Sequence, residues 1–311
     1  MLGDNFIKCI LKHTNYTSKN QPQNIKDTLR KLLIPYFLLI IFILTTNLML
    51  IYGFYKTSRP FTITTKLFIY LSMVDIAMIL LRAFYTFQSI LNFEMPCLVV
   101  QVLIMSMEFS YIYGLTIFAT ISFLRYWSIK NPLQSISVSH IVFALIVQAI
   151  FCGVLTEIII MMPDLKLEPR DRTKLFYFLP LLQFLAVGFV MYVNIMSYKI
   201  LKSMKRKSGF SENIENTQRQ KILSEANTCL LYITVFYILC PLPMFILSLL
   251  SMVKIHVLYG LWDTWEIYLL TFAQLLFVSN TGINSLIVVL RTKILREFYR
   301  TFLQNKILQF F

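Results

Sequence analysis

Four polar side chains fall in otherwise apolar stretches of the sequence, where they could bind one another or a cation. Asp75 is flanked by LSMV and IAMIL, and Asn47 lies in a similar run. Asn280 and Asn284 are four residues apart, so a helix presents both on one face. An ionisable side chain at the centre of a bilayer costs about 2.5–3.5 kcal/mol on insertion scales. We therefore expect these four groups to satisfy one another, directly or through water or a cation, unless they only join helices.

A second set of polar and aromatic side chains is expected nearer one end of the same stretches. A few polar groups among aromatic rings are typical of a small-ligand pocket. The same residue types also form interhelical hydrogen bonds and aromatic belts, so the interpretation stays open. The candidate lining residues are Gln101, Glu108, Tyr111, Tyr113, Glu157, Gln183, Trp265, Tyr268 and Gln274.

Other kinds of chemistry find little support. The 5 cysteines have no paired spacing and the 3 histidines are scattered, so the sequence offers no metal framework. No nucleophile–base pair indicates an enzyme. The net charge of +14 could suggest nucleic acid, but 57% of the residues are hydrophobic, which is unlike a basic nucleic-acid binder.

Composition indicates which elements carry these groups. Only 14% of the 311 residues are charged, against roughly 25% in soluble domains. Because a helix needs about 20 apolar residues to cross a bilayer, continuous apolar runs predict membrane helices. Seven runs qualify: Leu32–Tyr55, Leu67–Leu91, Cys97–Trp127, His140–Met162, Leu175–Tyr198, Ala226–Val253 and Ile267–Leu290. Arg82 lies inside the second, so we expect its surroundings to be protein or water.

The predicted orientation places the amino terminus outside the cell. With that orientation, the larger share of the 29 Lys and Arg residues lies in cytosolic segments. Asn15-Tyr16-Thr17 is a glycosylation acceptor triplet, which requires an external location. No cleavable signal peptide is visible, so the first span is expected to direct insertion. The organisation is then an external segment (1–31), a membrane domain (32–290) and a cytosolic tail (291–311).

Short motifs in a fixed order resemble those of rhodopsin-like G-protein-coupled receptors along nearly the whole chain. They are LSMVDIA in the second run, SFLRYWSIKNPL after the third, YILCPLP in the sixth and SNTGINSLIVVLRTKILREF from the seventh onward. The matching residues are Asn47, Asp75, Arg125, Tyr126, Pro132, Pro180, Cys240, Pro243 and Asn284. The resemblance implies an all-α membrane protein, a seven-transmembrane helix bundle with a short amphipathic eighth helix. It also makes sodium the candidate cation for Asn47, Asp75, Asn280 and Asn284.

The sequence departs from the family pattern at several motif positions. Leu124 replaces the acid before Arg125, and Pro241 replaces the tryptophan of the sixth run. Ser285 and Val288 replace the proline and tyrosine of the seventh. The second outer loop has no cysteine, so the usual disulfide cannot form, although Cys9 and Cys97 could pair instead. The missing acid predicts elevated basal signalling unless Glu225 replaces it.

The resemblance implies a plasma-membrane receptor that relays an external ligand to a heterotrimeric G protein. The ligand would be a small molecule, an odorant or a short peptide, as for invertebrate orphan chemosensory or peptide receptors, including nematode serpentine receptors. The sixth run would pivot at Pro241 and Pro243 and expose Arg125 to the G protein, while basic inner segments contact membrane lipids. The alternatives are a receptor-like decoy or subunit that does not couple, and a seven-helix ligand-gated channel with its amino terminus inside.

Overall fold

The computed structural model describes residues 33–57, 62–91, 97–131, 134, 136–161, 178–208, 214–243, 245–246 and 264–308. Within these ranges the protein is all-helical, with eight helices and no strand. They are α3 (Leu33–Thr57), α4 (Ile63–Leu91), α5 (Cys97–Lys130), α6 (Val138–Met161), α8 (Phe178–Ser208), α9 (Ile214–Leu239), α11 (Thr264–Arg291) and α12 (Lys293–Leu308).

Six of these helices, α3, α4, α5, α6, α8 and α11, are long and apolar enough to cross a membrane. They coincide with six of the seven predicted runs. The apolar part of α9, Glu225–Leu239, is shorter than a bilayer requires. The predicted sixth run extends to Val253, and residues 247–263 lie outside the described part of the chain. The all-helical class is therefore confirmed, with six helices that could cross a membrane, while the count of seven crossings stays a prediction.

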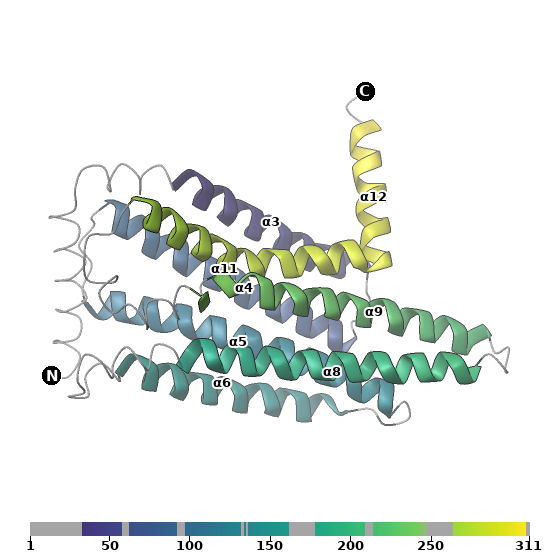
Figure 1. Ribbon diagram of the computed structural model, residues 1–311. Helices are drawn as coiled ribbons and strands as arrows, with labels where there is room; N and C mark the ends of the chain where they lie inside the picture. The colour runs from purple at the N-terminus through teal and green to yellow at the C-terminus, as the bar shows by residue number, and fades with distance from the viewer. Residues whose placement is uncertain are drawn as a thin grey trace.

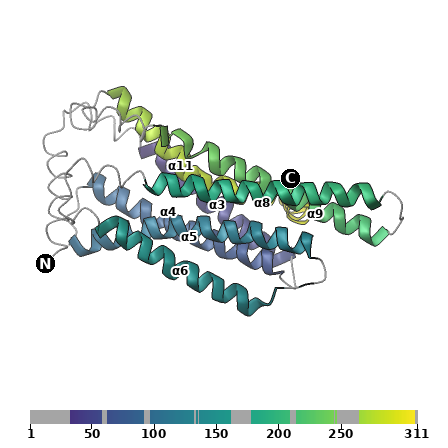
Figure 2. The same cartoon turned by 60° about the horizontal axis from the view of Figure 1, so that its bottom comes forward.

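The long helices form one elongated bundle (Figures 1 and 2). Contacts between neighbours close a ring that runs α3–α4–α5–α8–α9–α11 and back to α3, with α6 packed against α5. The central helix is α5. Its most apolar stretch is 72% buried, compared with 11% for that of the peripheral helix α6. Side chains of α5 therefore contact most of the bundle and are well placed to connect its two ends.

The outer surface of the bundle is apolar, as expected of a protein surrounded by lipid. On α6, one face exposes a run of large hydrophobic side chains: Val142, Phe143, Ile146, Val147, Ile150 and Phe151. Phe143 is 69% exposed, and Ile34 on α3 is exposed to the same degree. Soluble monomers rarely expose contiguous apolar patches of this kind. The described helices therefore support a multi-pass membrane protein.

The short helix α12 turns away from the bundle axis directly after α11 (Figure 1). Two side chains of α12 anchor it on α3. Leu295 is fully buried, and the Tyr299 hydroxyl donates a hydrogen bond to the Met49 carbonyl of α3. The contact depends on Gly53, because a Cβ there would lie only 2.8 Å from Leu295 Cδ2. Burial raises the pKa of Tyr299 to about 12. We call this end of the bundle the α12 end.

Candidate functional site

All four residues of the predicted polar network are buried and lie on helices that contact one another. Asn47 on α3, Asp75 on α4, and Asn280 and Asn284 on α11 are each less than 5% exposed. The contacts α3–α4, α11–α3 and α11–α4 bring these helices together at mid-bundle. The four residues are thus buried on helices that contact one another, and whether they satisfy one another depends on their hydrogen bonds.

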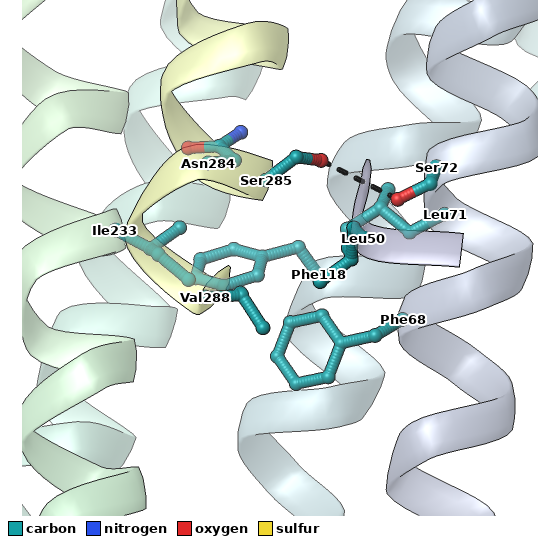
Figure 3. Close-up of a pocket in the computed structure, with 9 residues that line it drawn as sticks. All are labelled: Leu50, Phe68, Leu71, Ser72, Phe118, Ile233, Asn284, Ser285 and Val288. Carbon is teal, nitrogen blue, oxygen red and sulfur yellow. Dashed lines mark hydrogen bonds between the residues drawn. The ribbon is translucent and has the colours of Figure 1, made fainter. Parts of the chain in front are cut away.

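Hydrogen bonds satisfy only part of this network. The Ser285 hydroxyl donates to Asn47 Oδ1 at 2.6 Å, and the Asn47 amide donates to the Ile43 carbonyl at 2.9 Å. Ser285 also lies 3.3 Å from the Ser72 hydroxyl (Figure 3). Ser285 stands where the resemblance led us to expect proline, and it takes the role of joining α3, α4 and α11. Sequence reasoning recorded Ser285 as a loss and missed this role.

The other half of the network has unpaired polar atoms. Within the described residues, Asp75 Oδ2 and Asn280 Oδ1 are buried without a hydrogen-bond partner, and Asn284 has at most one polar partner, the Tyr237 hydroxyl. The expected mutual satisfaction therefore does not include them. Asp75 faces α5 at Gly114, where a Cβ would lie 3.8 Å from Asp75 Oδ1. These three residues offer one carboxylate and two amide oxygens, the kind of donor that hard cations prefer.

A small cavity borders the network on the side nearer the α12 end (Figure 3). Its volume is about 10 Å³, roughly the space that one water molecule requires. Its walls are mainly apolar, and Asn284, Ser285 and Ser72 supply the polar part. The lining residues are Leu50, Phe68, Leu71, Ser72, Phe118, Ile233, Asn284, Ser285 and Val288. This cavity is too small for an organic ligand.

Helix α9 meets the network through one aromatic side chain. Tyr237 stacks on Phe118 of α5, with ring centroids 4.8 Å apart, and interacts with Asp75 and Asn284. Just beyond it, α9 ends at Leu239, and the chain turns at Cys240 and Pro241. The predicted interruption at these prolines is confirmed, and buried Cys240 lies in the turn. Pro243 follows in a helical residue pair, half-buried.

Arg125 lies near the α12 end of α5 and is half-buried. Cys229 of α9 lies near it, and Arg291 of α11 lies near Cys229 in turn. Glu225, the suggested substitute for the missing acid, is exposed and forms no ion pair with any residue that the structure describes. Leu124 is buried in the core. Arg125 therefore lies on α5 close to α9 and α11, and the residue before it is an apolar core residue in place of the family's acid.

The neighbours of Arg125 in the motif have separate surroundings. Tyr126 is half-buried, and its ring lies 5.7 Å from Lys130 Nζ. Pro132, Asn15 and Cys9 lie outside the described residues, as does the side chain of Cys97. The three cysteines whose side chains are described, Cys152, Cys229 and Cys240, are free and buried. The suggested Cys9–Cys97 pairing stays a prediction.

The candidate pocket residues do not converge on one place. Tyr111 is buried and packs against Phe277 of α11, with ring centroids 4.7 Å apart. Glu108 is half-buried one turn away on α5, and Arg82 of α4 interacts with it electrostatically. The guanidinium of Arg82 lies 5.7 Å from the Phe277 ring, so Arg82 faces protein as expected. Phe277 was not predicted, because an apolar residue in an apolar run carries no signal in the sequence.

Several predicted pocket residues point elsewhere. Tyr113 contacts Tyr70 of α4 and the Leu145 carbonyl of α6, at 3.3 Å each, and joins helices. Glu157, Tyr268 and Gln274 are exposed. The side chains of Gln101, Gln183 and Trp265 lie outside the described part of the structure. Glu108 and Tyr111 are therefore the predicted pocket residues that the described structure brings together.

A second buried polar cluster, which sequence reasoning missed, joins α8 to α9. The Asn194 amide donates to Thr234 Oγ1 at 2.9 Å, and the Asn227 amide approaches the Asn194 carbonyl at 3.5 Å. Within the described residues, Oδ1 of Asn194 and Oδ1 of Asn227 have no partner. Their positions in two predicted membrane runs would have been a usable signal. The cluster links the two helices that extend furthest at the α12 end (Figure 1).

No protein-family model matches this chain, and no curated protein matches it significantly.

Proposed function

We propose that this protein is a seven-transmembrane receptor of the rhodopsin-like G-protein-coupled type, located in the plasma membrane with its amino terminus outside. The observation that carries the proposal is the half-satisfied polar network at mid-bundle. Asp75 and Asn284 are buried with unpaired atoms, next to a fully hydrogen-bonded Asn47–Ser285 pair. A purely structural network would be expected to satisfy its members. One that leaves strong polar atoms unpaired favours a second arrangement.

The energetics support a two-state switch. Each unpaired buried polar group costs about 1–3 kcal/mol. A cation or water bound by Asp75, Asn280 and Asn284 offsets that cost in one state, and a rearranged α11 offsets it in another. Two such states differ in free energy by a few kcal/mol. A ligand that binds one state more tightly than the other can therefore shift their populations. Sodium in the resting state fits the hard-oxygen donors.

Helix α9 would carry the change to the inner end. Tyr237 connects α9 to Phe118, Asp75 and Asn284, and the Cys240–Pro241 turn lies directly beyond it. When α9 moves outward at this turn, Cys229 separates from Arg125. The guanidinium then becomes accessible to the carboxyl-terminal helix of a G-protein α subunit, whose last carbonyls attract a cation. Basic residues of α12, Arg296 and Arg300, would contact anionic lipid.

The test is signalling in transfected cells that express a promiscuous G protein. Because Leu124 replaces the acid that precedes the arginine in the family pattern, we expect second-messenger output without ligand, and Arg125→Ala should reduce it to background. Lys130→Ala, which removes an exposed charge one turn along α5, is the matched control and should leave output unchanged. Surface expression is measured for every variant. Equal output from wild type and Arg125→Ala would reject coupling through this arginine and favour a non-coupling receptor-like protein.

Topology is tested separately. If the amino terminus is outside, Asn15→Gln should abolish a glycosidase-sensitive mobility shift, while Asn20→Gln, which is outside an acceptor triplet, should not. An epitope before Asn15 that antibody reaches only in permeabilised cells would instead indicate the inverted seven-helix channel.

A further inference from the structure

Two opposite charges face each other inside the bundle, away from the polar network and from Arg125. Arg82 is seven residues beyond Asp75 on α4, which places it on the same helix face and about 10 Å further from the α12 end. Its Nε is buried without a hydrogen-bond partner. Among the described residues, its guanidinium makes no hydrogen bond or ion pair, and its ring contact is with Phe277 at 5.7 Å.

Glu108 is the opposite charge. It lies on α5 one turn before Tyr111, whose ring packs against Phe277 beside Arg82. The two side chains are near enough to influence each other electrostatically, yet no nitrogen–oxygen distance of 4.0 Å or less joins them. Glu108 forms no hydrogen bond within the described part of the chain. The two charges are thus close enough to interact and too far apart to satisfy one another directly.

This separation is unusual for charges within a membrane bundle. Ionisable residues there pair with each other, with backbone carbonyls, or with a substrate or ion. Arg82 presents five N–H donors in a fork that fits a carboxylate, and the Glu108 carboxylate suits an ammonium group. Tyr111 packed on Phe277 supplies an aromatic floor beside the guanidinium.

Charge balance narrows the ligand class. Arg82 and Glu108 sum to zero when both are ionised. A ligand with one net charge would leave one buried charge uncompensated, which is costly in a low-dielectric interior. A ligand that carries a carboxylate and an amine adds no net charge and gives each side chain a partner.

We propose that Arg82 and Glu108 bind the carboxylate and the ammonium of a small zwitterionic ligand, a free amino acid or a short peptide, against the Tyr111–Phe277 ring pair. This inference rests on the proposed receptor function for its physiological meaning. The binding site itself is defined by side chains within one bundle and needs no G protein.

The experiment is ligand-induced thermal stabilisation of the purified full-length protein in detergent, so it does not depend on coupling. The probes are the twenty standard amino acids and a set of dipeptides. For each probe that stabilises the protein, the decarboxylated amine and the N-acetylated acid are tested as well. We expect at least one zwitterion to stabilise the protein, and each singly charged analogue to need at least a tenfold higher concentration.

Variants make the assignment specific. Arg82→Gln and Glu108→Gln should each raise the half-saturating concentration at least tenfold, while Lys66→Gln, an exposed position at the other end of α4, should not change it. Should a single variant fail to fold, the double variant Arg82→Gln/Glu108→Gln removes both charges together and should fold without responding. No stabilisation by any zwitterion, or equal stabilisation by a singly charged analogue, would overturn the proposal. Zwitterion binding without signalling would instead retain the site and reject the coupling proposed above.

Discussion

Two glycines at helix contacts provide a quantitative test of the bundle. Gly282 of α11 faces α3, and a Cβ there would lie 2.9 Å from both Ile43 Cγ1 and Phe42 Cε1. Ile43 is fully buried, so it has no space into which it can move. Gly53 of α3 has the same relation to α12 through Leu295 and Tyr299. We predict that Gly282→Ala forces α3 and α11 apart by several tenths of an ångström.

The magnitude follows from two opposing effects. Alanine stabilises a helix interior by roughly 0.5–1 kcal/mol relative to glycine. Overpacking a tight core costs about 1–3 kcal/mol. Gly153 and Gly188 have nothing within 4 Å of an added Cβ, so they experience only the favourable effect. Gly282→Ala should therefore be about 1–3 kcal/mol less stable than Gly153→Ala or Gly188→Ala, which corresponds to about 2–12 °C in melting midpoint at 2–4 °C per kcal/mol.

The assay is the apparent thermal unfolding midpoint of purified variants in one detergent at one scan rate. Gly153→Ala and Gly188→Ala are the matched controls, and their midpoints should equal or exceed that of the wild type. Gly114→Ala is an intermediate case, because its nearest contact would be 3.6 Å, an ordinary distance. A Gly282→Ala midpoint as high as that of the two controls would refute the close α3–α11 packing.

Two further predictions concern contacts at the α12 end. The Arg291 guanidinium lies 4.2 Å from the Tyr232 ring and links α11 to α9. If this contact contributes about 0.5–1 kcal/mol to the resting state, Arg291→Ala or Tyr232→Leu should raise ligand-free signalling about two- to fivefold, and unchanged output would count against it. The Tyr299 hydroxyl donates to Met49, and its folded-state pKa of about 12 exceeds the usual 10, so this contact is stable below pH 10 and weakens from pH 10 to 12. A spin label at Leu303→Cys should gain mobility over that interval, and Tyr299→Phe should remove the transition; a pH-independent label in the parent would contradict the assignment.

Much of the fold could be predicted because lipid makes the pattern simple. Long apolar runs must become helices, since no water satisfies the backbone, and six described helices match predicted runs. The burial of Asp75, Asn47, Asn280 and Asn284 follows from the same reasoning, because a polar group in an apolar run is best placed away from lipid. Helix ends were less predictable: α9 continues far into the polar segment before Glu225, where periodicity gives no boundary.

The predictions that were wrong share one physical cause: the direction in which a side chain points depends on the rotation of its helix and on the neighbouring helices. Tyr113 and Tyr111 are two residues apart on α5, yet one contacts α4 and α6 while the other contacts α11. Glu157 and Glu108 both occur in apolar runs, but among the residues that the structure describes, an opposite charge lies near Glu108 and none is found near Glu157. Ser285 was judged by the residue it replaces, although its hydroxyl is what joins Asn47 to Ser72.

In the part of the bundle that the structure describes, four buried or half-buried charged residues fall into three layers: Arg82 with Glu108, then Asp75, then Arg125. Arg82 and Asp75 both lie on α4, and Glu108 and Arg125 both lie on α5. Each of these two helices therefore connects two of the layers. Tyr237 is the element that can change the second and third layers together, because it stacks on Phe118 of α5 and interacts with Asp75 while belonging to α9. A ligand that draws Arg82 and Glu108 together would alter the α4–α5 contact that holds Phe118 against Tyr237. Loss of the stack between Phe118 and Tyr237 would then allow α9 to move and to carry Cys229 away from Arg125. The three layers can thus act as one switch while α4 and α5 stay in place.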